Sequence, residues 1–283
     1  MSGMQDLVVA GGVEMMSYTQ TAPRSEDKNK TVDGANAHLR ALHPQPHQGI
    51  CADMIATLEG YTREDVDALA VTSQERADKA IKNGHFEKAL IPIKNDDGSI
   101  ALDHEEFPRP GTTMESLAKL PTVFDNFMGV EIDNTGETFD HLVKRKYPDL
   151  EINHVHHAGN SSGVVDGAAA LILANEDYTK GQGWKPRARV VATATAGGSP
   201  TLMLNEPVPA AKEVLKKAKM ELSDIDLFEV NEAFSVVALK FIRDLGLDPE
   251  IVNPNGGAMA LGHPIGATGS ILIGTALDEL ERQ

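Results

Sequence analysis

The sequence reads N-P-N-G-G-A-M-A-L-G-H-P-I-G-A-T-G from Asn253 to Gly269. Each of its five glycines would cost roughly 0.5–1 kcal/mol of backbone entropy in a regular element, so the stretch suits a sharply turning loop that a ligand approaches closely. His263 stands between a glycine and a proline, and the apolar run at 271–273 predicts a helix after the loop. A histidine on a rigid loop at a helix start is well placed to polarise a carbonyl or to act as a base.

A second motif, V-N-E-A-F at 230–234, follows a strand-like apolar segment at 225–230. Taken alone, each motif has a simpler interpretation. The glycine-rich stretch would be a turn with an incidental histidine, and Asn231 would be a helix N-cap, a role worth about 1 kcal/mol. Together, the two segments resemble the thiolase superfamily, in which N-E-A-F and G-G-x-x-x-x-G-H-P-x-G-x-x-G are paired active-site loops.

The resemblance extends over most of the chain. Residues 7–17 read L-V-V-A-G-G-V-E-M-M-S, which is similar to the A-G-G-x-E-x-M-S strand and turn of thiolases. Residues 157–169 read H-A-G-N-S-S-G-V-V-D-G-A-A, which is similar to their T-A-G-N-A-S-G-x-x-D-G-A-A segment. Because four motifs occur in the family's order, the chain resembles the acetyl-CoA C-acyltransferases and acetyl-CoA acetyltransferases of that superfamily.

The resemblance implies an α/β fold with thiolase-like α-β-α-β-α layers, an inserted loop domain and an incomplete first half. Within this fold we expect a remnant of the N-terminal half at 1–17 and a loop domain that covers CoA at 18–153. The end of the N-terminal half would follow at 154–185, and an incomplete C-terminal half at 186–283.

Local patterns predict the elements of this fold. Strands are predicted at the apolar segments 7–10, 89–93, 189–196 and 225–230, and a buried strand or helix at 168–174. Turns are predicted at 11–12 and 96–99. Helices are predicted from a capping box at 62–65 to Asn83, and at 209–220 and 231–245. Strands that alternate with helices favour a mostly parallel sheet covered on both faces.

Cysteine usage sets this chain apart from the family pattern. Thiolases use two cysteines, an acylated nucleophile in the first half and an acid/base cysteine in a C-x-G-G-G turn near the end. This chain has only Cys51, and its sequence looks like a thiolase cut at both ends. Cys51 lies where a helix start can activate a thiol, but free cysteine is also a common core residue, and thiolases carry no nucleophile there. We therefore predict a structural role for Cys51 and no thiolysis by the chain itself.

By motif position, the resemblance makes His263 the base that activates the nucleophilic thiol and helps to bind the thioester oxygen. Asn231 would hold a water that completes this oxyanion site, and Glu232 would fix the loops. For CoA, the resemblance implies the residues Arg109, Ser162, Ala158, Phe124, Met203 and His47. The forked donors of Arg109 would meet the adenosine phosphate, and Ser162 would bond the pantetheine arm. The alternatives are a solvated arginine and ordinary packing of the apolar residues.

Two short segments depart from the family pattern. The chain has His47-Gln48-Gly49 where many thiolases have H-M-G, which alters the expected pantetheine and acyl pocket. It has Leu204-Asn205-Glu206-Pro207 where they have G-T-G-P, which adds an acidic side chain to a turn.

Composition excludes some classes of protein. The 42 acidic and 26 basic residues argue against a nucleic-acid surface, which needs a basic stripe, and the anionic CoA would need a local basic patch. No apolar run reaches the roughly 18 residues of a membrane span, and the start lacks the regions of a signal peptide. We expect a cytoplasmic protein without an internal disulfide or a cofactor. The histidines at 154, 156 and 157 fit no regular metal-ligand spacing, so we predict no metal.

Two functions remain open from the sequence. The first is a thiolase, which cleaves 3-oxoacyl-CoA by thiolysis or condenses acyl-CoA with acetyl-CoA, as a homodimer or homotetramer when complete. The second is a non-catalytic thiolase-like protein that binds CoA or lipid, which the missing cysteines favour. We prefer the first, because N-E-A-F and G-H-P loops have no evident purpose in a pure binder. By itself, the chain should expose a sheet edge and apolar surface and form ill-defined oligomers.

Overall fold

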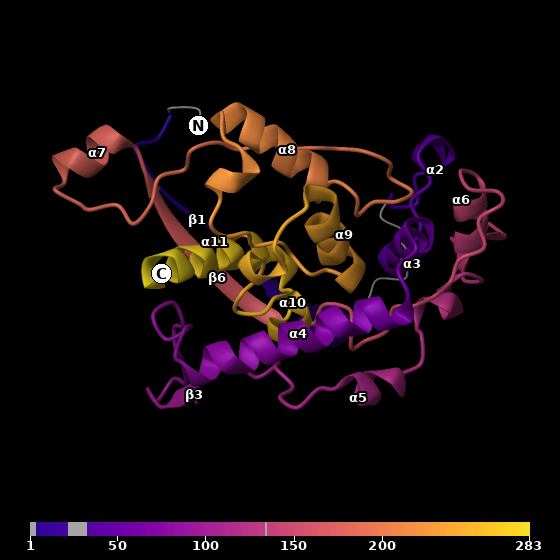
Figure 1. Ribbon diagram of the computed structural model, residues 1–283, viewed down its shortest axis with the longest axis horizontal. Coiled ribbons are helices and arrows are strands. Elements are labelled where there is room, and N and C mark those ends of the chain that lie inside the picture. Colours follow the sequence, from indigo (N-terminus) through magenta and orange to yellow (C-terminus); the bar gives the residue numbers. More distant parts are fainter. Residues whose placement is uncertain (1–3, 22–32, 134) are drawn as a thin grey trace.

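The computed structural model describes residues 4–21, 33–133 and 135–283. Figure 1 shows a long two-stranded ribbon, β1 (Leu7–Met15) and β6 (Asp166–Ala174), with helix α11 (Ile265–Arg282) lying against it. The strands are antiparallel, and Val9 lies opposite Ile172 in their register. The predicted boundaries at 1–17 and 18–153 enclose residues 1–3, 22–32 and 134, which lie outside the described part of the chain.

The turn predicted at Gly11-Gly12 is wrong, because both glycines lie inside β1. A Cβ on Gly12 would overlap the carbonyl oxygen of Gly266 in the first turn of α11. Gly12 therefore marks the point where a helix backbone approaches the strand too closely for any side chain.

The strand or helix predicted at 168–174 is the strand β6, but β6 is not buried. Its exposure alternates along the strand, because one face of the ribbon packs on α11 and the other is open. On the open face, Val9 is 74% exposed and Ile172 is 71% exposed. The ribbon therefore presents an unusually apolar surface.

The long helix α4 (Arg63–Lys82) dominates the next part of the chain, with α5 (Met114–Ala118) beside it (Figure 1). The other elements between β1 and β6 are short, namely α1 (Met16–Thr21), α2 (Ala37–Leu42), α3 (Gln48–Glu59), β2 (Ile93–Lys94), β3 (Ile100–Leu102), the 3-10 helix η1 (Phe124–Phe127), β4 (Glu131–Ile132), β5 (Glu137–Thr138) and α6 (Phe139–Lys144). The predicted capping box of α4 is confirmed, since Thr62 and Asp65 each accept from the other's backbone N–H. The strand predicted at 89–93 is wrong except at Ile93, whereas the turn at 96–99 is confirmed and joins β2 to β3.

After β6 the chain is mainly helical. Its elements are α7 (Glu176–Gly181), α8 (Pro207–Ala218), the 3-10 helices η2 (Leu222–Asp224) and η3 (Pro249–Ile251), α9 (Ser235–Leu245), α10 (Ala258–Leu261) and α11. Helix α8 begins at Pro207 and not at residue 209, with proline in the first turn as expected. Helix α9 begins at Ser235 and not at Asn231, with Phe234 in the cap position. Asn231 is therefore not an N-cap, and its side chain is available to the site.

The strands predicted at 189–196 and 225–230 are wrong. Neither segment forms a strand, although Phe228 makes a single parallel bridge with Val252. A strand requires a second backbone at hydrogen-bonding distance, and the described residues place none beside 189–196, where Val191 is 57% exposed. The strand ladders that the described residues do form are antiparallel, so the mostly parallel sheet is not seen among them.

The main core lies where α3, α4 and α9 meet. Ala52, Val66 and Val236, one from each helix, are completely buried in it. Apolar burial of this kind contributes about 25 cal/mol per Å², and here it fixes the start of α9 and the loop before it. Within residues 4–21, 33–133 and 135–283, every helix is too short or too polar to cross a bilayer.

Candidate functional site

Two loops carry the residues that the sequence singled out, 229–234 before α9 and 253–264 before α11. The side chain of Asn253 joins the loops, because it accepts from the N–H of Val230 at 2.8 Å and donates to the Val230 carbonyl at 2.8 Å. Asn253 has a φ of 47°, a left-handed conformation that asparagine tolerates better than most residues. One amide side chain thus takes the place of a strand pairing between the two loops.

A third segment, around Gly163, completes the frame. The N–H of Ser162 donates to the carbonyl of Ala233 at 3.0 Å. The N–H of Gly163 donates to the carbonyl of Ala258 at 3.2 Å. In return, the N–H of His263 donates to the carbonyl of Gly163 at 2.9 Å. These backbone bonds bring the predicted site residues Ser162 and His263 into one rigid frame.

Hydrogen bonds determine which nitrogen of His263 carries the proton. The hydroxyl of Thr268 donates to the carbonyl of Pro264 at 2.9 Å, so its oxygen is the acceptor in the 2.7 Å contact with Nδ1 of His263. Nδ1 therefore holds the proton of the neutral ring, and Nε2 keeps a lone pair. Nδ2 of Asn231 lies 3.2 Å from Nε2 and donates to it. The site presents an unprotonated imidazole nitrogen with an amide beside it.

The surroundings of His263 keep its ring neutral. Burial lowers the pKa of His263 below its usual value of 6.5, against an opposing attraction from the carboxylate of Glu14. The neutral ring therefore predominates at neutral pH. Such a ring can take a proton from a thiol, and the resulting imidazolium can donate to a developing oxyanion. The geometry suits acyl chemistry at a carbonyl.

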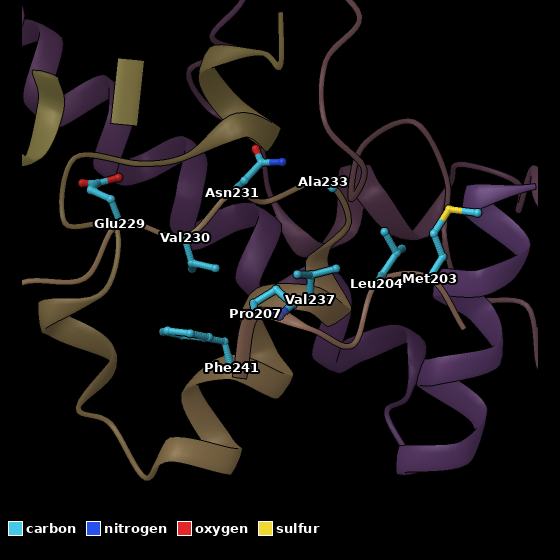
Figure 2. Close-up of a pocket in the computed structure, with 9 residues that line it drawn as sticks. All are labelled: Met203, Leu204, Pro207, Glu229, Val230, Asn231, Ala233, Val237 and Phe241. Carbon is cyan, nitrogen blue, oxygen red and sulfur yellow. The ribbon is translucent and has the colours of Figure 1, made fainter. Parts of the chain in front are cut away.

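Asn231 also faces a cavity of about 380 Å³ beside α9 (Figure 2). The cavity is lined mostly by apolar residues, namely Met203, Leu204, Pro207, Glu229, Val230, Asn231, Ala233, Val237 and Phe241. Figure 2 shows the carboxyl of Glu229 and the amide of Asn231 on the side away from the ring of Phe241. A mostly apolar cavity with a few polar atoms is typical of a small-molecule site.

Glu229 was missed by the sequence analysis. Burial raises the pKa of Glu229 to about 8, and the negative charges of Glu232 and Glu279 add to the effect. The residue as a whole is half-buried, but its Oε1 is sealed from solvent and has no hydrogen-bond partner within the described part of the chain. Glu229 is therefore protonated at neutral pH. Its only sequence signal was an acidic residue inside the apolar run L-F-E-V.

Glu232 fixes the loops, as the sequence analysis expected. Its carboxylate accepts from the hydroxyl of Ser73 at 2.7 Å, from Nδ2 of Asn253 at 3.0 Å and from the N–H of Met259 at 3.2 Å. A Cβ on Gly257 would overlap this carboxyl group. Burial raises the pKa of Glu232, and the donors oppose that rise. The side chain therefore ties loop 253–264 to α4.

Of the residues expected to bind CoA, Arg109 lies at the surface. Its guanidinium carbon is 5.6 Å from the ring centroid of Phe107, and its backbone N–H donates to Oε1 of Gln74 at 2.8 Å. The side chain is exposed, which is compatible both with a phosphate contact and with a solvated arginine.

His47 and Phe124 lie together in an aromatic cluster. The ring of His47 stacks on Phe124 and Phe127, with centroids 5.6 and 4.6 Å apart. Its Nδ1 caps α3 by accepting from the N–H of Gly49 at 3.1 Å, and burial lowers the pKa of His47. Phe124 in turn meets Phe234 edge-on at 5.6 Å. Both residues therefore have structural roles, and the cluster reaches the N-E-A-F loop.

The two remaining candidates lie in different surroundings. Met203 lines the cavity beside Asn231 and has a φ of 58°. Ala158 is exposed in the turn before Ser162. The structure thus brings Met203 and Ser162 to the loops of Asn231 and His263, and it gives Ala158 no contact that assigns it a role.

The three clustered histidines pair with aspartates. Nδ1 of His154 and of His156 lie 2.6 and 2.7 Å from the carboxylate of Asp53 in α3, and Nε2 of His157 lies 2.8 Å from that of Asp67 in α4. Burial opposes ionisation of Asp53, but the bonds from His154 and His156 hold its pKa below the usual value. These residues join the segment before Ser162 to the helices. Among the described residues, no group of three or more His, Cys, Asp or Glu side chains is arranged to hold a metal.

Cys51 is a core residue, as predicted. It is completely buried in α3, and its Sγ lies 3.9 Å from the carbonyl oxygen of Pro46. Burial raises the pKa of the thiol to about 12. A thiol of that pKa in a closed core is not a nucleophile at neutral pH.

Comparisons with known proteins match most of the chain. The family description "Thiolase, N-terminal domain" matches residues 1–140, and "Thiolase, C-terminal domain" matches residues 184–283. The acetyl-CoA acetyltransferase of Thiocystis violacea is 36% identical over 295 residues, which cover 99% of this chain and 67% of that protein. The 3-oxoadipyl-CoA/3-oxo-5,6-dehydrosuberyl-CoA thiolase of Escherichia coli (strain K12) is 39% identical over 301 residues, which cover 100% of this chain and 68% of that protein.

Solved structures extend the likeness to the fold. The crystal structure of human mitochondrial 3-ketoacyl-CoA thiolase in complex with CoA matches with a TM-score of 0.76 at 33% identity, covering 99% of this chain and 66% of that one. The predicted thiolase-like fold is confirmed by this match. The chain spans about two thirds of the length of the relatives that it matches.

Proposed function

The chain belongs to the thiolase family, and from this premise we propose that its site binds CoA thioesters and serves acyl transfer to carbon. The reaction is thiolytic cleavage of a 3-oxoacyl-CoA or, in reverse, condensation of an acyl-CoA with acetyl-CoA. One observation carries the proposal: Nε2 of His263 is unprotonated and accepts from the amide of Asn231 at 3.2 Å, at the junction of the two family loops.

In this proposal His263 moves the proton and Asn231 helps to bind the oxygen. Nε2 takes the proton of a thiol, the thiolate attacks the carbonyl carbon, and negative charge develops on the carbonyl oxygen. The imidazolium N–H would then donate to that oxygen, and a water held by the amide of Asn231 would be the second donor. Preorganised donors of this kind commonly supply several kcal/mol of transition-state stabilisation, and Thr268 keeps the ring in the required tautomer.

This chain does not supply the nucleophilic thiol that the family reaction uses. Cys51 is its single cysteine, and the pKa of that buried thiol is raised to about 12. We therefore expect the chain to bind CoA thioesters without turning them over. The same observation supports the second candidate function, a thiolase-like protein that binds CoA or lipid without catalysis.

The CoA contacts are proposed from motif position and from the surroundings of each residue. Arg109 would meet the adenosine phosphate, because it is exposed and permanently charged. Ser162, Ala158, Phe124, Met203 and His47 would line the pantetheine arm. Ser162 has the strongest support, since its backbone bonds to Ala233 in the N-E-A-F loop at 3.0 Å.

The cellular setting follows from the reaction. Free CoA thiol is a substrate of thiolysis, which favours the reducing cytoplasm, and 3-oxoacyl-CoA substrates favour a role in fatty acid metabolism. A complete protein of this kind is proposed to be a homodimer or homotetramer.

Calorimetric titration of the 283-residue chain with acetyl-CoA tests the proposal. We expect saturable binding that weakens in Arg109→Ala, and no turnover of acetoacetyl-CoA with free CoA above background. Absence of binding would refute the CoA-thioester site. Turnover that Cys51→Ala abolishes would show instead that Cys51 is a nucleophile, which would contradict its structural role.

A further inference from the structure

Gln74 is a buried residue of α4 that contacts two loops at once. It is 5% exposed, and the two ends of its side-chain amide point to different partners. Oε1 accepts from the backbone N–H of Arg109 at 2.8 Å, and Nε2 donates to the carbonyl of Met259 at 3.2 Å. One amide therefore bridges the loop of the proposed CoA contact and the loop that leads into His263.

The bond to Arg109 is selective because of its neighbours. Arg109 stands between Pro108 and Pro110, and proline has no backbone N–H. The N–H of Arg109 is thus the only backbone donor of this tripeptide. Gln74 accepts from that one donor and so fixes the point from which the guanidinium extends.

The bond to Met259 has a second support beside it. Ser73, the preceding residue of α4, donates to Glu232 at 2.7 Å and accepts from the N–H of Gly257 at 3.0 Å. Met259 lies within α10 (Ala258–Leu261), which directly precedes Gly262 and His263. Ser73 and Gln74 therefore both bond to the segment at 257–259, where the short helix α10 begins, and α10 leads directly to Gly262 and His263.

We propose that Gln74 is a positioning residue that couples the CoA-contacting loop of Arg109 to the loop of His263. An amide is suited to this position, because it offers an acceptor to Arg109 and a donor to Met259 at the same time. The contribution of Gln74 to CoA binding rests on the proposed function, and it is measured by CoA affinity. The contribution of Gln74 to the placement of His263 is independent of that function, and it is measured by the pKa of His263.

The test is Gln74→Met in the full 283-residue chain, with Glu75→Met as the matched control. Methionine has nearly the length of glutamine but neither donor nor acceptor, so both loops lose their anchor. Glu75 is the next residue of the same helix and is exposed. The pKa of His263 is read by histidine hydrogen–deuterium exchange with mass spectrometry, and CoA affinity by calorimetry.

We expect the pKa of His263 in Gln74→Met to rise toward 6.5, because the relaxed loop admits water to the ring. We also expect CoA to bind about tenfold more weakly, the size of effect that loss of a buried hydrogen bond produces. Glu75→Met should change neither quantity. General destabilisation would leave the pKa of His263 in the folded protein unchanged, so this readout separates positioning from mere support.

The proposal is overturned if folded Gln74→Met has the same pKa of His263 as the wild-type chain. It is also overturned if the wild-type chain binds CoA and the variant binds it with the same affinity. If the wild-type chain binds no CoA, the proposed function fails, while the pKa of His263 still decides the positioning role. If Gln74→Met does not fold, Gln74→Glu replaces it. That variant keeps the acceptor for Arg109, loses the donor to Met259, and should speed amide exchange over 257–263; wild-type exchange there would also overturn the proposal.

Discussion

The reactivity of the site depends on a single hydroxyl, that of Thr268. The hydroxyl of Thr268 donates its hydrogen bond to the carbonyl of Pro264, so its oxygen is the acceptor for Nδ1 of His263. Nε2 is thereby left as the basic nitrogen, next to the amide of Asn231. At the level of single residues, the tautomer of His263 is therefore set by its contact with Thr268.

Thr268→Val should lower the pKa of His263 further below 6.5. The imidazolium needs an acceptor for its Nδ1 proton more than the neutral ring does, because a hydrogen bond from a charged donor is stronger. Thr268→Ser keeps the hydroxyl and should keep the wild-type pKa. Histidine hydrogen–deuterium exchange measures both variants, and equal values in valine and serine variants would exclude the role given to Thr268.

Glu229→Gln should stabilise the fold at neutral and mildly alkaline pH. The pKa of Glu229 is raised by burial to about 8 from 4.5, so the folded protein retains a proton that the unfolded chain loses above pH 4.5. The wild-type fold is therefore penalised increasingly as pH rises from 4.5 toward 8, and glutamine removes that penalty. The melting temperature of the variant should exceed that of wild type at pH 8 and match it near pH 4.5; a difference independent of pH would contradict this assignment.

Between elements, β1 and α11 approach each other closely at Gly12. Gly12→Ala should lower the melting temperature, because the new methyl group would overlap the carbonyl of Gly266 and push the helix off the strand. Gly269→Ala is the control in α11, since an added Cβ there meets nothing within 4 Å. At position 269, alanine should stabilise the helix by about 1 kcal/mol, which would raise the melting temperature by roughly 2–4 °C in a chain of this size. Equal effects of both substitutions would refute the close contact.

Elements whose signals are local were predictable from the sequence. The capping box of Thr62 and Asp65 spans one helical turn, and α4 begins where it indicates. Strands depend on a partner backbone, which is why 189–196 was predicted as a strand and is not one. Asn231 shows a different limit: its residue type favours a cap, but its side chain is bonded to His263 and the helix begins later.

The candidate site was predictable only to the extent that motifs mark it. The motifs marked His263, Asn231 and Ser162, and they paired the loops of His263 and Asn231. The bond of Gln74 to Met259 joins residues 185 positions apart, and that of His154 to Asp53 spans 101. No local pattern carries such pairings, so the network that holds the loops required the structure.

For the molecule as a whole, the open face of the β1–β6 ribbon is the exceptional surface. Ile172 is 71% exposed on it, opposite Val9, and contiguous apolar patches of this kind promote association. Ile172→Lys should therefore reduce the mass of the chain measured by light scattering without lowering its melting temperature. Ile91→Lys, at a residue that is 81% exposed outside the ribbon, should leave the mass unchanged. A monodisperse wild-type monomer would contradict this expectation.

We propose that a CoA thioester binds where the loops 229–234 and 253–264 meet, and amide hydrogen–deuterium exchange with and without saturating acetyl-CoA measures this binding at the loops themselves. We expect acetyl-CoA to slow exchange over 107–113, 229–234 and 257–264, with no change in α7 (Glu176–Gly181). Exchange over 229–234 and 257–264 that acetyl-CoA leaves unaltered would contradict it.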